Sequence, residues 1–188
     1  MNRMHRADRM TTTVWAAVVA LFCTTIPLAS EFTHAPDLTL SDLKGSKVKV
    51  DYRAGKLTLV NFWAVWCGPC REEMPDIARL FGKYSSQGFQ AVGVAVQSGE
   101  SSDVKEFLEQ NKDYGINYPI LMGVDETLER FGDVQAVPTT YLIDPTGKVL
   151  KRFIGVTPGF AVKLEDEISK AIGPDSSKPS KPPKPTKQ

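Results

Sequence analysis

The chain has 188 residues, of which 41% are hydrophobic, so it can form one domain with a full core. Its 23 basic and 22 acidic side chains give a net charge of +1, and the excess positive charge lies at the two ends. Because no basic cluster occurs in the middle, the composition argues against a nucleic-acid-binding protein, which neutralises phosphates with grouped Lys and Arg.

The first 30 residues have the layout of a secretory leader. A positive stretch ends at Arg9, an apolar run covers Val14–Leu28, and small residues follow it. The run is short for a permanent transmembrane anchor, which needs about 20 apolar residues. We therefore expect residues 1–30 to be a signal peptide, with an uncleaved membrane anchor as the alternative.

The next segments predict a strand that leads into a helix. Short alternating stretches at 38–40 and 48–50 predict a small β-hairpin. Residues 57–63 form a nearly continuous apolar run, which is typical of a strand buried on both faces of a sheet. From Cys67 to Tyr84 apolar side chains recur at helical spacing, so this strand is expected to lead directly into a helix.

Strands and helices alternate through the rest of the domain. We expect a strand at 89–96, a turn at 98–102, a helix around 104–108, a strand at 118–122, a helix at 125–131, a hairpin from 139–144 and 148–154, and a closing helix at 160–172. The order is a parallel βαβ half, an extra αβ segment and an antiparallel ββα half. This alternation predicts an α/β fold with parallel neighbouring strands.

The last 15 residues differ in composition from the domain. Residues 174–188 mix Pro, Ser and Lys and contain no large apolar side chain, so we expect a disordered, solubilising tail. Contact of its lysines with anionic lipid or a cell-wall polymer is the alternative. The predicted domain therefore covers residues 36–173.

The chemistry is predicted at Cys67-Gly68-Pro69-Cys70, where the buried strand turns into the helix. Residues three apart at a helix start point the same way, so the two sulfurs can form a disulfide. Cys67 occupies the N-cap position, where free backbone N–H groups and the positive helix end favour a thiolate. Because Pro69 has no N–H, Cys70 is the expected donor to the Cys67 sulfur. We therefore expect Cys67 to attack and Cys70, one turn inside, to resolve.

Two other interpretations of the cysteine pair are less favoured. A structural zinc site needs four ligands, whereas Cys23 is the only other cysteine and the two histidines are His5 and His34. Cys23 lies in the predicted leader and the histidines lie in or near it. An inert structural disulfide would not require placement between a strand and a helix.

Two longer motifs carry a family resemblance. The segment VNFWAVWCGPCREEMP at 60–75 and the segment VPTTYLID at 137–144 resemble the TlpA/ResA branch of the thioredoxin superfamily. The resemblance covers residues 36–172 and includes the extra αβ segment at about 101–122. It implies a thioredoxin-like fold, a central mixed β-sheet flanked by helices, with an N-terminal hairpin and an αβ insertion. It also implies an exported, often membrane-tethered reductase.

The resemblance assigns further roles around the cysteines. Pro138 would follow a cis peptide bond and lie beside Cys67, with the backbone of Val137 pairing to an extended substrate segment. An ordinary trans proline that begins a strand is the alternative. Trp66, together with Gly68 and Pro69, would form the substrate-binding rim, whereas Trp63 would pack in the core.

One departure from thioredoxin concerns the proton of the resolving thiol. Thioredoxin has a buried Asp six residues before its first cysteine, and here that position is Asn61, which cannot accept a proton at neutral pH. Glu73, three residues after Cys70, is the best substitute and matches a Glu of the ResA-like branch. A solvated surface charge is the alternative for Glu73. Pro75 is expected to interrupt the helix, as a kinking proline does in thioredoxins.

Other functions fit the sequence less well. A peroxiredoxin-type thiol peroxidase has Pro-x-x-x-Thr/Ser-x-x-Cys, and a copper carrier of the Sco kind has a more widely spaced cysteine pair and a distant His. Neither pattern occurs. A non-catalytic thioredoxin-fold binding module would be expected to lack one cysteine or Pro138, and all three are present.

The resemblance also suggests the partners. Gly-Pro between the cysteines is similar to reducing thioredoxins, so we expect a monomeric reductase of disulfide-bearing proteins, with no cofactor beyond the Cys67–Cys70 pair. In an oxidising compartment such a reductase needs a membrane electron donor of the DsbD/CcdA type. Apocytochrome c, in cytochrome c maturation in the periplasm or an equivalent extracytoplasmic space, is the family's leading candidate substrate.

Overall fold

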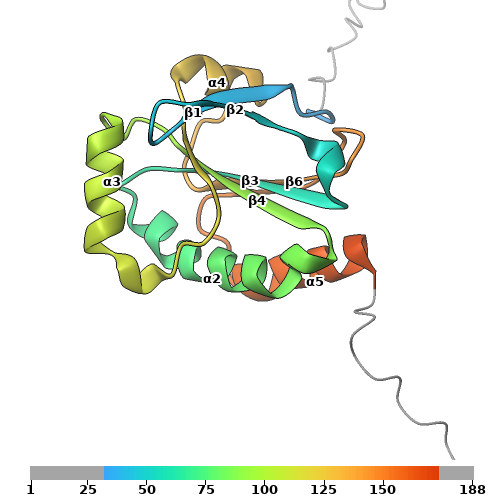
Figure 1. Cartoon of the computed structure of the whole chain (residues 1–188). Helices are drawn as coiled ribbons and strands as arrows, with labels where there is room; N and C mark the ends of the chain where they lie inside the picture. The colour runs from blue at the N-terminus through green and yellow to red at the C-terminus, as the bar shows by residue number, and fades with distance from the viewer. Residues whose placement is uncertain (1–31, 174–188) are drawn as a thin grey trace, which may run out of the picture. The chain divides into compact units, whose positions relative to one another are not determined.

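The computed structural model of the chain describes residues 32–173 (Figure 1). The predicted leader at 1–30 and the predicted tail at 174–188 lie outside these described residues. Within residues 32–173, no helix combines the length and apolar character needed to cross a membrane.

Seven strands and four α-helices make up the described domain, and they confirm the predicted α/β fold. In chain order the elements are β1 (Leu38–Asp42), β2 (Lys47–Val50), β3 (Leu57–Trp63), α2 (Gly68–Tyr84), β4 (Phe89–Ala95), α3 (Ser101–Gln110), β5 (Ile120–Met122), α4 (Asp125–Arg130), β6 (Thr139–Ile143), β7 (Val149–Ile154) and α5 (Phe160–Ile172). Short 3₁₀ turns, which the sequence patterns did not predict, follow β2, α2 and α3.

One mixed sheet has the strand order β2-β1-β5-β4-β3-β6-β7. The central strand β3 is parallel to β4 and antiparallel to β6, and all seven of its side chains are buried. Helices α2, α5 and α3 cover one face of the sheet, and α4 covers the other (Figure 1). A strand covered on both faces cannot shift its register without exposing apolar side chains, so the residues that follow β3 have a fixed place.

Helix α2 packs on the sheet through one apolar face. Met74, Ile77 and Leu80 recur at helical spacing and are fully buried. Pro75 lies on the exposed side of the same helix, and α2 continues past it to Tyr84. The predicted interruption at Pro75 is therefore wrong, because the buried face on both sides of the proline outweighs its missing N–H.

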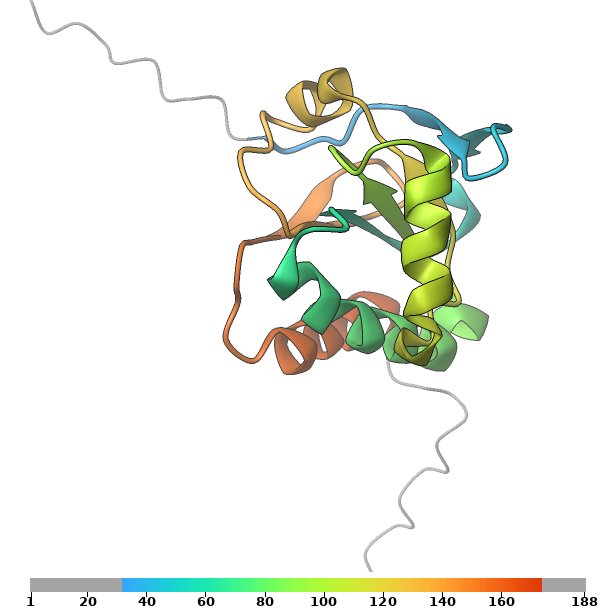
Figure 2. The same ribbon diagram turned by 90° about the vertical axis from the view of Figure 1, so that its left-hand side faces the viewer.

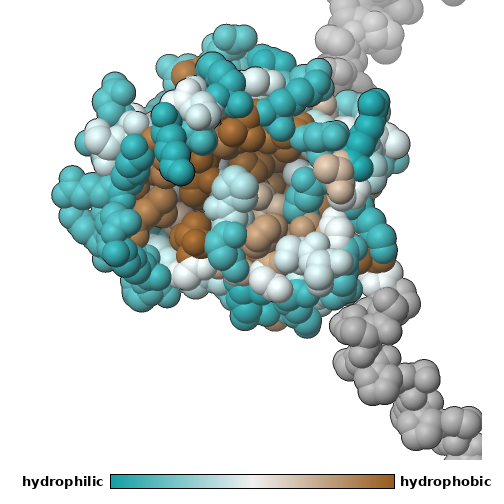
Figure 3. Space-filling view, viewed as in Figure 1, coloured by the Kyte–Doolittle hydropathy of each residue, from teal (hydrophilic) through white to brown (hydrophobic). Residues whose placement is uncertain are grey.

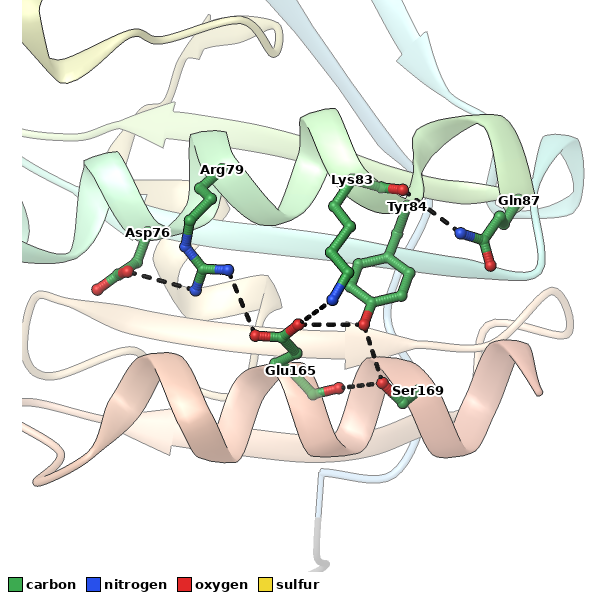
Figure 4. A network of polar contacts seen from close by, with 7 residues as sticks. All are labelled: Asp76, Arg79, Lys83, Tyr84, Gln87, Glu165 and Ser169. Atoms are coloured by element: carbon green, nitrogen blue, oxygen red, sulfur yellow. Dashed lines mark hydrogen bonds and ion pairs between the residues drawn. The ribbon is translucent and has the colours of Figure 1, made fainter. Parts of the chain in front are cut away.

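A polar network joins the second half of α2 to α5 (Figure 4). The Glu165 carboxylate accepts hydrogen bonds from Lys83 Nζ (2.6 Å), the Tyr84 hydroxyl (3.2 Å) and Arg79 Nη1 (3.3 Å). The Tyr84 hydroxyl also bonds the Ser169 hydroxyl at 3.1 Å. The Lys83 hydrogen bond holds the pKa of Glu165 below its usual range. These contacts fix α5 along α2 at the end of α2 that lies away from the cysteines.

The predicted N-terminal hairpin is present and extends the sheet. Strand β1 pairs with β5 at only two positions, Ser41 with Met122 and Asp42 with Leu121. A groove of about 130 Å³, lined by both polar and apolar side chains, lies between the hairpin and β4 (Figure 3). Strand β5 begins at Ile120 rather than at the predicted Tyr118, because Pro119 has no N–H to donate to the ladder.

Candidate active site

Cys67 and Cys70 form a disulfide at the start of α2, with their Cα atoms 5.3 Å apart. Figure 2 looks onto the end of the sheet where β3 ends and α2 begins. Both cysteines are buried, and both belong to the core cluster between the sheet and α2. The sulfurs are therefore shielded from bulk solvent while they lie one short loop away from a rigid strand.

Cys67 is the N-cap of α2. Its backbone is extended, and its sulfur accepts a hydrogen bond from the backbone N–H of Cys70 at 3.2 Å. Gly68 and Pro69 form the start of the helix, and Pro69 has no N–H that could compete for the sulfur. After reduction, the same N–H and the positive helix end would face a Cys67 thiolate. Cys70 lies inside the first turn of α2, so its sulfur does not occupy the N-cap position.

The predicted rim residues lie at this end of the sheet. Trp66 is 61% exposed, and Gly68 and Pro69 are partly exposed. The Val137–Pro138 peptide bond is cis. Since β6 pairs Thr139 with Phe62 of β3, Pro138 falls next to the end of β3, and half-buried Val137 packs against the cluster that holds both cysteines.

Glu73 is a buried carboxyl on the helix face of Cys70. The Glu73 residue is only 8% exposed. Burial, and then the charges of Asp76 and Glu72, raise the pKa of Glu73 to about 7. Glu73 is therefore not a solvated surface charge but a group that can gain or lose a proton near neutral pH.

Asn61 occupies the middle of β3 and is buried. Its amide Nδ2 donates to the hydroxyl of Thr140 on the paired strand β6 at 2.9 Å. This bond gives the buried Nδ2 group of Asn61 a partner within the sheet. Asn61 is therefore a structural polar residue here, and Glu73 is the only carboxyl among the predicted site residues.

The sequence patterns missed Gln97 and Ser98, in the loop that follows β4. The backbone N–H of Val65 donates to the Ser98 hydroxyl at 3.1 Å, and the Trp66 indole N–H donates to the Gln97 carbonyl at 2.9 Å. The one signal in the sequence was the expected parallel pairing of β3 and β4. Parallel neighbouring strands end at the same edge of a sheet, so the loop after β4 could be expected near the loop that carries Cys67.

Metal ligands are not grouped in the described part of the chain. Residues 32–173 contain no cluster of three or more His, Cys, Asp or Glu side chains that could hold a metal ion. At this end of the sheet the structure places the two cysteines, the rim formed by Trp66, Gly68 and Pro69, and the Val137–Pro138 segment.

The raised pKa of Glu73 predicts how stability depends on pH. In the unfolded chain Glu73 loses its proton near its ordinary value of 4.5, and in the fold only near 7, so rising pH favours the unfolded state across this range. In the oxidised chain, Glu73→Gln should raise the free energy of unfolding at pH 8 by up to roughly 3 kcal/mol and leave it nearly unchanged at pH 4. Urea unfolding at both pH values measures this difference.

The matched control is Glu129→Gln, which removes an exposed carboxyl on α4 that is not among the charges raising the pKa of Glu73. It should change the free energy of unfolding by less than about 0.5 kcal/mol at either pH. An equal effect of both variants would show that general charge removal, and not the burial of Glu73, is responsible.

Comparisons with known proteins agree with this geometry. The model of the AhpC/TSA family matches residues 33–152. The thiol-disulfide oxidoreductase ResA of Bacillus subtilis is 39% identical over 127 residues, which cover 67% of this chain and 68% of ResA. ResA of Geobacillus thermodenitrificans is 42% identical over 124 residues, which cover 64% of this chain and 67% of that protein.

A solved structure also resembles this chain in fold and sequence. A Chlorobium tepidum protein assigned as a thiol:disulfide interchange protein DsbE superimposes with a TM-score of 0.66 at 34% identity, covering 74% of this chain and 96% of that one. The fold, the cysteine pair at the start of α2 and these relatives agree with one another. The chain therefore belongs to the AhpC/TSA family, and within it to the thiol-disulfide oxidoreductases similar to ResA.

Proposed function

We propose that this chain is a protein-disulfide reductase that works outside the cytoplasm through reduced Cys67 and Cys70. The observation that carries the proposal is the Cys70 N–H that bonds the Cys67 sulfur at the start of α2. A Cys67 thiolate attacks one sulfur of a substrate disulfide, forms a mixed disulfide and releases the first substrate thiolate. Cys70 then loses its proton and attacks the Cys67 sulfur. The second substrate thiolate leaves, and two electrons have passed to the substrate.

The reducing direction follows from the modest stabilisation of the Cys67 thiolate. One backbone N–H and one helix end favour it. A strongly stabilised thiolate stabilises the reduced protein and makes the disulfide a strong oxidant. Stabilisation by these two features alone supports a weakly stabilised thiolate, and hence a couple that donates electrons.

Glu73 is proposed to move the proton of the Cys70 thiol. Residues 70 and 73 share the buried face of α2, and the pKa of Glu73, raised by burial to about 7, allows proton gain and loss at neutral pH. Asn61 cannot take this role because an amide does not titrate. Glu73 would accept the Cys70 proton as Cys70 attacks and return it to solvent or to a leaving thiolate.

The substrates are proposed to be disulfide-bearing proteins, including apocytochrome c. An extended substrate segment would pair with the Val137 backbone and contact the rim at Trp66, Gly68 and Pro69. A membrane electron donor of the DsbD/CcdA type would return the Cys67–Cys70 disulfide to the dithiol. The protein would act as a monomer and need no bound cofactor, because the cysteine pair itself carries the two electrons.

The leader-like composition of residues 1–30 supports export, either as a cleaved signal peptide or as a tether to the inner membrane. A reductase in an oxidising compartment must be reduced again after each turnover, which fits a membrane donor. Recovery of the mature N-terminus from the exporting cell distinguishes cleavage from a retained tether.

Cysteine variants of the full chain test the reaction directly. In an insulin-reduction assay driven by dithiothreitol, Cys67→Ser should abolish activity, because the attacking sulfur is gone. Cys70→Ser should accumulate mixed disulfides that gel electrophoresis without reductant separates and mass spectrometry locates at Cys67. Cys23→Ser is the matched control and should retain full activity. Undiminished insulin reduction by Cys67→Ser would overturn the assignment.

The Glu73→Gln variant tests proton transfer. Stopped-flow reduction of a protein disulfide by the dithiol form should slow by at least about tenfold near pH 7 and lose its pH dependence between about 5 and 8. Glu129→Gln, on the exposed surface of α4, should behave like the unaltered chain. Asn61→Asp in the Glu73→Gln background should recover part of the rate. If Glu73→Gln and Glu129→Gln have the same pH profile, Glu73 moves no proton in this reaction.

A further inference from the structure

The loop that carries Cys67 is short and depends on its neighbours for its shape. Only residues 64–66 separate β3 from Cys67, and the Cys67 N–H closes the turn on the Ala64 carbonyl at 3.1 Å. Val65 and Trp66 are only two residues and one residue before Cys67, so a displacement of either is passed on to the attacking sulfur. Whatever holds Val65 and Trp66 also sets the position of that sulfur.

Ser98 holds this loop from the end of β4. Ser98 is only 5% exposed. Its hydroxyl donates a hydrogen bond to the Val96 carbonyl at 2.9 Å and accepts one from the Val65 N–H at 3.1 Å. A serine hydroxyl has a single hydrogen. Because that hydrogen goes to Val96, a lone pair remains directed at Val65. Removal of the hydroxyl would leave a partly buried N–H and a buried carbonyl without this partner.

Gln97 supplies a second contact in the same loop. Its backbone is left-handed, with φ of +47°, which is uncommon for a residue other than glycine. Its carbonyl accepts the Trp66 indole N–H at 2.9 Å. Since 61% of Trp66 is exposed, packing alone does not hold this ring, and the hydrogen bond sets its orientation.

The two contacts continue the β3–β4 ladder. The Val96 N–H donates to the Trp63 carbonyl at 2.9 Å, one residue past the last paired residues of the two strands. The segment Val96–Ser98 thus follows Trp63–Trp66 along the whole path from the sheet to Cys67. Rigid support of this kind reduces the entropy cost of aligning a nucleophile with the atom that it attacks.

We propose that Ser98 is a positioning residue for thiol-disulfide exchange, which it supports by fixing the Val65–Trp66 loop and, through it, the Cys67 sulfur and the Trp66 rim. The inference rests on the exchange reaction of the cysteine pair and adds a residue that touches neither sulfur. Ser98 acts only through hydrogen bonds to backbone groups, so its effect should follow the presence of a hydroxyl at position 98.

The test compares Ser98→Ala and Ser98→Thr with the matched control Ser169→Ala in the full chain. Ser169 also donates its hydroxyl to a backbone carbonyl, that of Glu165 at 2.8 Å, but it lies on α5 in the network away from the cysteines. The second-order rate of protein-disulfide reduction by the dithiol form and the unfolding midpoint are measured for each variant. If the unaltered chain reduces no protein disulfide, the exchange reaction itself is refuted. That outcome is distinct from a failure of the role proposed for Ser98, which appears only in the comparison of variants.

Ser98→Ala should slow the reduction about tenfold while the chain remains folded, as expected for one lost buried hydrogen bond at a reacting loop. Ser98→Thr keeps the hydroxyl and should restore most of the rate. Ser169→Ala should leave the rate unchanged. The proposal is overturned if folded Ser98→Ala reduces the substrate at the unaltered rate, if threonine fails to restore it, or if Ser169→Ala slows it equally.

Amide hydrogen exchange gives a test that does not depend on the folding of a variant. In the unaltered chain the Val65 N–H should exchange far more slowly than the exposed amides of the same loop, because it is bonded to Ser98. Exchange of the Val65 amide at the rate of a free amide would contradict the proposed contact.

Discussion

The hydrogen bond from the Cys70 N–H to the Cys67 sulfur is the interaction on which the chemistry of this protein depends. It exists because β3, buried on both faces, delivers Cys67 to the start of α2 in one register. Pro69 removes a competing donor, and the buried face of α2 keeps the helix in place past Pro75. The polar network of Glu165 then fixes α5 against the far half of α2. The buried strand and the buried face of α2 thus hold one sulfur at one helix end, whereas the network secures the far half of the helix.

The charges around the pair distinguish the two thiols. Cys67 has the helix end and the Cys70 N–H, whereas Cys70 shares the buried face of α2 with Glu73, three residues later. Burial raises the pKa of Glu73 to about 7, so the same low-polarity surroundings that protect the resolving thiol also make its neighbour a proton acceptor near neutral pH. In the proposed mechanism, one apolar helix face would account for both the shielding of Cys70 and the proton transfer that resolution of a mixed disulfide requires.

Local patterns made most of the fold and the cysteine site predictable. A fully apolar run, a cysteine at a helix start and helical spacing after it are properties of neighbouring residues, and the relatives similar to ResA confirm the assignment. The burial of Glu73 was left open because spacing gives the face of a helix but not what covers it. The contacts of Gln97 and Ser98 were missed because they join positions about 30 residues apart through a left-handed turn at a residue other than glycine.

The midpoint potential of the Cys67–Cys70 couple tests the proposed direction of electron flow most directly. In the proposed reductase, the Cys67 thiolate is stabilised by only one backbone N–H and one helix end. Equilibration of the full chain with glutathione or dithiothreitol buffers, with the thiols counted by alkylation and mass spectrometry, gives this potential. We expect a value more negative than about −220 mV, whereas a value near about −120 mV, that of a strong disulfide donor, would contradict the proposed reducing direction.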